Sequence, residues 1–164
     1  MPEPLEDCYN QLQTLITTEI KNSKNLKEAI NRINTNPKIL ELKSRVRNGF
    51  QEIARRIYRK YHKKPIPVYI STKKYKTRTF GMYFFSKLSG KGRGITIFIL
   101  HSPKFIKWEE KPKLLYVRPY NDVLETLAHE LTHHLGYTYH NKQFFKKKNE
   151  IYKEVKQIEK EIFV

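Results

Sequence analysis

Cysteine is almost absent from this chain of 164 residues, since Cys8 is the only one. A single thiol cannot form an intramolecular disulfide, and it cannot build a zinc site of the cysteine type. Such a low cysteine content is typical of proteins in a reducing, intracellular compartment. We therefore expect any metal centre in this chain to use histidine or carboxylate ligands.

Long apolar runs are missing as well. No stretch approaches the ~20 consecutive apolar residues that a membrane-spanning helix needs. The N-terminal segment, residues 1–7, is acidic and lacks the apolar core of a secretory signal. These absences predict an intracellular protein, in the cytoplasm, nucleoid or nucleus, with no membrane partner.

Acidic residues are scarce relative to basic ones. The chain has 16 Asp and Glu residues against 33 Lys and Arg residues, and its formal net charge is +17. A field of that size favours polyanions, of which nucleic acid is the usual one. Basic residues gather in residues 45–64, 73–78 and 146–148, where they are suited to phosphate contacts that give affinity without sequence preference. The charge predicts a nucleic-acid partner.

The apolar spacing predicts an α+β fold. Helical periodicity runs through residues 5–20, 26–33, 38–61, 119–136 and 141–162. Residues 68–70, 79–85 and 94–100 are rich in β-branched and aromatic residues and are joined by short polar turns. They predict a small antiparallel meander, with one more short strand expected at residues 113–117. The expected order is therefore N-terminal helices, a small antiparallel sheet, and two C-terminal helices.

The first of the two C-terminal helices carries the pattern H-E-x-x-H, from His129 to His133. On a helix, positions i and i+4 lie on one face, so the two imidazoles can grip one Zn²⁺ ion. Glu130 between them then points near the metal, where it can take a proton from a zinc-activated water. His134 points about 100° away around the helix and is expected to support the site or lie on the surface.

His140 is the preferred third ligand, and its position requires a turn. On an unbroken helix it would lie roughly 10 Å beyond His133, too far for a Zn–N bond of about 2.0–2.1 Å. Gly136 can adopt a positive φ and end the helix, so that the chain returns towards the metal. Glu150 and Glu154, on the following helix, are the alternative third ligands. Three protein ligands leave one position free for water, as a catalytic zinc requires.

The segments 124–133 and 140–144 resemble the SprT-like zinc metalloproteases of the Spartan and Wss1 types. Members of that family commonly follow their H-E-x-x-H helix with an H-G-x-x-F segment that carries the third ligand, and here Asn141 replaces the glycine. The resemblance implies a zincin-like minimal metalloprotease domain at residues 36–164, preceded by an N-terminal helical extension at residues 1–35. It implies zinc bound by His129, His133 and His140, and Glu130 as general base. It further implies a DNA-binding protease that acts on DNA-associated or DNA-crosslinked proteins.

Other zinc proteins share parts of this pattern. Metzincins need a methionine turn after the motif, and the only methionines, Met1 and Met82, precede it. A zinc-dependent endoribonuclease that acts on RNA has a related three-histidine pattern with a Gly-Tyr pair, similar to Gly136 and Tyr137, but it lacks the motif glutamate. A DNA-binding protein with a non-catalytic zinc is the third alternative, although structural sites usually have four protein ligands.

Overall fold

The computed structural model describes residues 4–85 and 92–162, and it confirms the α+β class. The element order is α1 (Leu5–Lys21), α2 (Leu26–Thr35), α3 (Pro37–Lys60), β1 (Val68–Ser71), β2 (Gly81–Phe85), β3 (Gly92–Phe98), β4 (Leu100–His101), β5 (Tyr116–Val117), α4 (Tyr120–His134) and α5 (Lys142–Ile162). All five predicted helices are present, and each begins and ends within three residues of the expected bounds.

Local side-chain caps fix two of the early helix starts. The Asn25 side chain accepts a hydrogen bond from the Glu28 amide at the start of α2. The Asn36 side chain accepts from the amides of Lys38 and Ile39 at the start of α3, and Pro37 occupies the first turn. Asparagine satisfies amides that the helix leaves without partners, and proline has no amide to lose there.

The sheet differs from the predicted antiparallel meander. Its strand order is β1-β3-β2, with β2 antiparallel to β3 and β1 parallel to β3. The segment 72–80 is not a tight turn, because it carries the chain past β3 to the far edge of the sheet, and Lys76 forms a bridge with His101 on the way. β4 and β5 form a separate antiparallel pair, so the short strand expected at residues 113–117 is confirmed in part.

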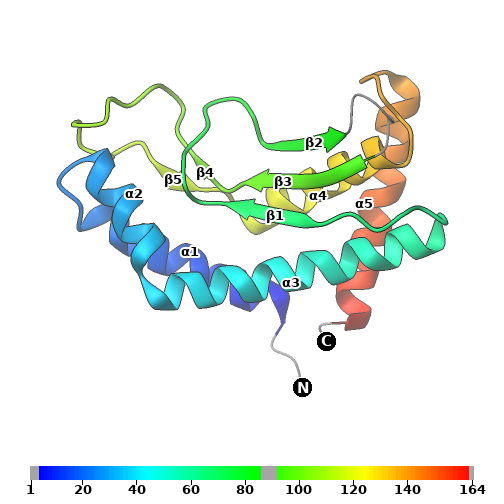
Figure 1. Cartoon of the computed structure of the whole chain (residues 1–164), viewed down its shortest axis with the longest axis horizontal. Coiled ribbons are helices and arrows are strands. Elements are labelled where there is room, and N and C mark those ends of the chain that lie inside the picture. The colour runs from blue at the N-terminus through cyan, green and yellow to red at the C-terminus, as the bar shows by residue number, and fades with distance from the viewer. Residues whose placement is uncertain (1–3, 86–91, 163–164) are drawn as a thin grey trace.

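One face of the three-stranded sheet packs on helices. In Figure 1, α4 lies behind the sheet, α3 runs along the edge at β1, and α5 stands at one end. The inward side chains of β1 and β3 are almost fully buried; they are Val68, Ile70, Ile95 and Ile97. Among the described residues, none of the helices combines the length and the apolar character that crossing a membrane requires.

Helices α1 and α2 contribute to the same apolar core as the rest of the chain. Tyr9 of α1 is fully buried, donates a hydrogen bond to the Arg118 carbonyl, and packs its ring 5.5 Å from that of Tyr120 on α4. The N-terminal helices thus support the start of α4. A domain boundary between residues 35 and 36 stays a prediction.

Candidate metal centre

Three histidines converge at the end of α4. His129 and His133 lie one turn apart, and their ring centroids are 5.1 Å from one another. The Nε2 atom of His140 lies 3.1 Å from Nε2 of His129 and 3.0 Å from Nε2 of His133. Their possible ligand atoms all lie within 4.8 Å of one another. The structure therefore brings together the three histidines that the sequence singles out.

The turn after α4 makes this convergence possible. The Gly136 amide donates to the His133 carbonyl and the Tyr137 amide to the Thr132 carbonyl, which is the bonding pattern of a Schellman motif. Gly136 has φ +110°, a conformation that side chains strongly disfavour, so the expected left-handed glycine is confirmed. The reversed chain then delivers His140 back to the helix it has just left.

The start of α5 fixes His140 from the other side. The Asn141 side chain accepts a hydrogen bond from the Phe144 amide, 3.0 Å away, and so caps α5 directly after His140. Phe144 is fully buried, and its ring centroid lies 4.7 to 5.0 Å from those of all three histidines. The packing of Phe144 against these rings restricts the side-chain rotation of the three histidines.

The donor set fits a zinc ion. Tetrahedral zinc with Zn–N bonds of about 2.05 Å places ligand nitrogens ~3.3 Å apart, close to the two Nε2 separations seen here. The carbonyl of Tyr137 lies 2.8 Å from Nδ1 of His133 and can only accept a hydrogen bond, so Nε2 of His133 carries the lone pair. Burial, together with the charges of His133, His140 and Lys148, lowers the pKa of His129 to about 4. Burial likewise lowers the pKa of His133. Neutral imidazoles are what a metal requires as ligands.

Glu130 lies beside the histidines in a dry environment. Its side chain is 5% exposed, and its Oε2 is a buried oxygen without a hydrogen-bond partner. Burial raises the pKa of this carboxyl to about 7. A buried carboxylate oxygen normally finds a donor, so the unpartnered Oε2 beside the three histidines is available to a group bound there.

Gly81 allows β2 to approach Glu130 closely. A Cβ atom at Gly81 would lie 2.6 Å from Cγ2 of Thr126 and 3.1 Å from Cγ of Glu130. Any larger residue would push the strand away from α4. The edge strand is therefore held directly against the helix that carries the motif.

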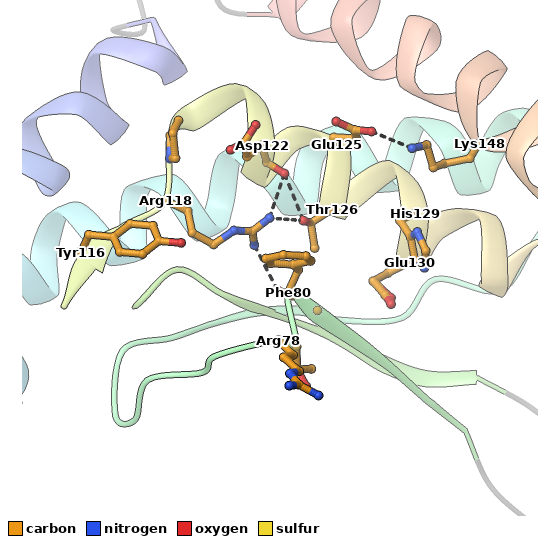
Figure 2. A pocket seen from close by; sticks show the side chains of 13 residues that line it. Arg78, Phe80, Tyr116, Arg118, Asp122, Glu125, Thr126, His129, Glu130 and Lys148 are labelled. Atoms are coloured by element: carbon orange, nitrogen blue, oxygen red, sulfur yellow. Dashed lines mark hydrogen bonds and ion pairs between the residues drawn. The ribbon is translucent and has the colours of Figure 1, made fainter. Parts of the chain in front are cut away.

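Two hollows meet along this contact, and both are lined by Gly81 and Glu130. The first, shown in Figure 2, extends past His129 towards the start of α4; its other main lining residues are Arg78, Phe80, Tyr116, Arg118, Asp122, Glu125, Thr126 and Lys148. The second extends past His133 towards the end of α4; it is lined by Lys63, Lys64, Met82, Tyr83, Phe85, Gly92, His134, Gly136 and Thr138. Together they form a cleft along β2 that passes over Glu130.

Arg118 fastens the start of α4 to the sheet and was not predicted from the sequence. Its guanidinium donates to the carbonyls of Phe80, Phe98 and Asp122 at 3.0 to 3.1 Å, and it lies over the Phe80 ring at 4.6 Å (Figure 2). The one available signal was an arginine set between apolar Val117 and Pro119, next to a predicted helix start. This side chain fixes the position of α4 relative to the segment at Phe80 that lines the cleft.

His134, next to His133 in the sequence, supports the site by joining α4 to the segments around it. His134 is buried, its Nε2 donates to the Lys64 carbonyl at 2.9 Å, and its Nδ1 faces the Tyr83 hydroxyl at 3.2 Å. Because the carbonyl can only accept, Nδ1 accepts the Tyr83 proton. His134 thus links α4 to β2 and does not join the cluster of His129, His133 and His140.

The alternative third ligands lie elsewhere. Glu154 is engaged by Lys60 and by the Tyr61 hydroxyl, and Glu150 lies 3.4 Å from Lys147. Neither joins the compact histidine group found among residues 4–85 and 92–162. The geometry therefore favours His140 as the third donor.

Comparison with known proteins gives one match. Residues 111–162 match the WLM domain, a zinc metalloprotease-type domain related to the SprT-like proteins. The match spans β5, α4 with its histidine motif, and α5, and the helices and sheet before residue 111 lie outside it. No curated protein and no solved structure matches the chain.

Proposed function

We propose that this protein is a zinc-dependent metallopeptidase in which His129, His133 and His140 hold one catalytic zinc ion and Glu130 is the general base. The observation that carries the proposal is the convergence of three Nε2 atoms beside a buried carboxylate whose Oε2 has no partner. The WLM match over the same segment supports a metalloprotease-type chemistry.

The chain's own residues account for the proton transfers of peptide hydrolysis. A bound zinc ion supplies Lewis acidity that makes water nucleophilic near neutral pH. Glu130 projects from α4 into the cleft, where its carboxylate accepts a proton as the water oxygen bonds to the scissile carbonyl carbon (Figure 2). When the C–N bond breaks, Glu130 returns that proton to the leaving amine.

The cleft favours an extended polypeptide as substrate. It runs past Glu130 in both directions, between β2 on one side and α4 on the other. An extended chain laid in it would place one peptide bond over Glu130 while its flanking residues occupy the two hollows. A site made for a small molecule would instead be enclosed.

The substrates we propose are proteins bound or crosslinked to DNA. Support comes from the net charge of +17 and from the resemblance of the motif segments to SprT-like proteases. The positive surface would hold the enzyme near DNA, and the peptidase centre would act on proteins attached there.

The test is cleavage of a DNA-binding protein by the zinc-loaded full chain, with and without single-stranded DNA. We expect fragments from wild type and none after chelation of zinc. Glu130→Gln should keep zinc and reduce cleavage by roughly 10²–10⁴-fold, the range of general-base catalysis. Glu150→Gln, which alters an exposed carboxylate on α5, serves as the matched control and should cut at the wild-type rate.

If Glu130→Gln cleaves protein as fast as wild type, the mechanism is wrong. RNA added to the same assay tests the endoribonuclease alternative: RNA cleavage without protein cleavage would favour it. The buried carboxylate of Glu130 beside the histidines favours the peptidase, because that ribonuclease pattern has no glutamate at this position.

A further inference from the structure

The positive charge of this protein is concentrated in one segment. Residues 53–108 contain fifteen of the 33 Lys and Arg residues and none of the 16 Asp and Glu residues. They therefore carry fifteen of the seventeen net positive charges. Strands β1 to β4 all lie in this acid-free segment, so the sheet itself is the most positive part of the chain.

The sheet has one face that none of the described helices covers. In Figure 1 no helix of residues 4–85 and 92–162 lies in front of the sheet, whereas α4 lies behind it. Side chains alternate between the faces of a strand, and the inward set is buried against the helices. The register pairs Tyr69 with Thr96, Met82 with Thr96, and Phe84 with Gly94, which places these side chains on the opposite, outer face.

Aromatic side chains form a platform on this outer face. Tyr69 is 46% exposed, and its ring is nearly parallel to that of Phe84, at an interplanar angle of 18° and a centroid distance of 6.4 Å. Phe84 lies on the backbone of the central strand, because a Cβ atom at Gly94 would come within 2.5 Å of its ring. Large apolar groups at such exposed positions usually mark a binding surface.

Cations border the platform on the β1 side. The Arg47 guanidinium lies 6.0 Å from the Tyr69 ring centroid and is anchored by a hydrogen bond from its Nε to the Val68 carbonyl. Lys43 lies one turn before Arg47 on α3, and Lys73 follows the end of β1. Burial first, and then the charge of Lys73, lowers the pKa of Lys43, so these two ammonium groups lie near enough to repel one another. Phosphates placed between them would relieve that repulsion.

We propose that this outer sheet face binds single-stranded DNA, with bases stacked on Tyr69 and Phe84 and phosphates held by Lys43, Arg47 and Lys73. The inference rests on the nucleic-acid part of the proposed function and assigns it a surface. Base stacking on flat rings requires unpaired bases, because a duplex hides their faces. A protein partner would have to bring acidic groups to a segment that has none of its own.

This placement keeps DNA out of the cleft. Tyr83 and Phe84 are consecutive in β2, and Tyr83 contacts His133 and His134 whereas Phe84 belongs to the platform. Single-stranded DNA bound on the outer face therefore leaves Glu130 accessible. A protein attached to that DNA would reach the cleft around the β2 edge of the sheet. The sheet would thus separate the DNA-binding face from the peptidase centre.

The first experiment measures binding of a fluorescent oligo(dT) of about 20 nucleotides to the full chain by anisotropy. We expect the double variant Tyr69→Leu/Phe84→Leu to raise the Kd at least ~10-fold, since stacking contributes about 1–3 kcal/mol per base. Leucine keeps apolar volume and removes the flat ring, and a thermal melt checks that the variant folds. Phe105→Leu removes another exposed aromatic ring, in the connection between β4 and β5, and should leave the Kd within about twofold of wild type.

The second measurement is the salt dependence of the same binding. Lys43→Gln and Lys73→Gln should each reduce the slope of log K against log[salt] by about 0.7, the value for one lost phosphate contact on a single strand. Lys160→Gln, which removes an exposed charge on α5, should leave the slope unchanged.

Three results would overturn the inference: wild-type affinity in the double variant, an equal loss in Phe105→Leu, or tighter binding of a matched duplex or oligo(rU) than of oligo(dT). Peptidase failure is distinguishable from failure of the platform. Glu130→Gln should bind oligo(dT) normally, and Tyr69→Leu/Phe84→Leu should cut a short peptide at the wild-type rate without DNA.

Discussion

The two faces of the three-stranded sheet differ in how they are built. On the inner face, Tyr83 packs its ring 6.3 Å from His133 and bonds to His134, so the strand is locked to the motif helix. On the outer face, Phe84 contacts Tyr69 and the backbone of β3, and no helix in the described part of the chain covers it. Because side chains alternate along a strand, one short segment serves two surfaces.

The difference shows two ways in which a sequence encodes function. The inner site depends on spacing, since His129, His133 and His140 converge only through a helix and one left-handed glycine. The outer face depends on composition, since its strands lie in a long acid-free segment and its rings occupy alternate positions, while Lys43 and Arg47 add charge from α3. A single substitution at the inner site should therefore abolish most of its function. On the outer face, each substitution should weaken binding only in part.

The largest effect is expected from His140→Ala. Removing one of three proposed ligands should lower zinc affinity by at least ~100-fold, beyond the 10–100-fold range of supporting residues. Zinc competition against a chromogenic chelator measures it, and oligo(dT) affinity should not change. Glu154→Ala is the matched control for the rival ligand. Full zinc retention in His140→Ala, with loss in Glu154→Ala, would assign the third ligand to the carboxylate.

The next largest effect is expected at Arg118, which joins the sheet to the start of α4. Arg118→Leu leaves the carbonyls of Phe80, Phe98 and Asp122 without their donor, so we expect destabilisation by about 3 kcal/mol. Urea denaturation measures it, with the exposed Arg55→Leu as control. A free energy of unfolding within ~0.5 kcal/mol of wild type would mean that Arg118 does not fasten α4.

A smaller effect is expected at the turn. No atom lies within 4 Å of a Cβ built at Gly136, so Gly136→Ala adds backbone strain at φ +110° without a clash. We expect a loss of about 1–2 kcal/mol in stability and a weaker zinc affinity, because the return of His140 is disturbed. Gly136→Asn, which tolerates left-handed backbone better, should lose less. Thermal melts with and without zinc separate the two effects, and equal melts for all three proteins would contradict the account.

The last effect is absent at neutral pH, appears only as the pH falls, and concerns His101 of β4. His101 is buried against Phe80, and burial together with the nearby charge of Arg118 lowers its pKa to about 4. The unfolded chain then binds more protons between pH ~6.5 and ~4, so stability should fall as pH drops through that window. His101→Phe should reduce the fall by about 1–3 kcal/mol, measured as the difference in urea midpoints at pH 7 and pH 4.5. An unchanged difference would show that His101 does not contribute.

The helices and the histidine cluster were within reach of the sequence because their signals are local. The apolar stripe of α3, the i, i+4 histidines and Gly136 each specify geometry within one or two turns of chain. The parallel pairing of β1 was not, because strand order depends on where the segment 72–80 crosses, and no local pattern records that path. Arg118 was missed for the same reason, since its partners Phe80 and Phe98 are distant in sequence.

The most direct test compares two variants on one DNA-bound protein substrate and one short peptide. We predict that Glu130→Gln cuts neither, whereas Tyr69→Leu/Phe84→Leu cuts the peptide like wild type and loses the advantage that DNA gives on the bound protein. Cleavage by Glu130→Gln, or equal loss of both activities in the double variant, would contradict the assignment of peptidase and DNA binding to opposite faces of the sheet.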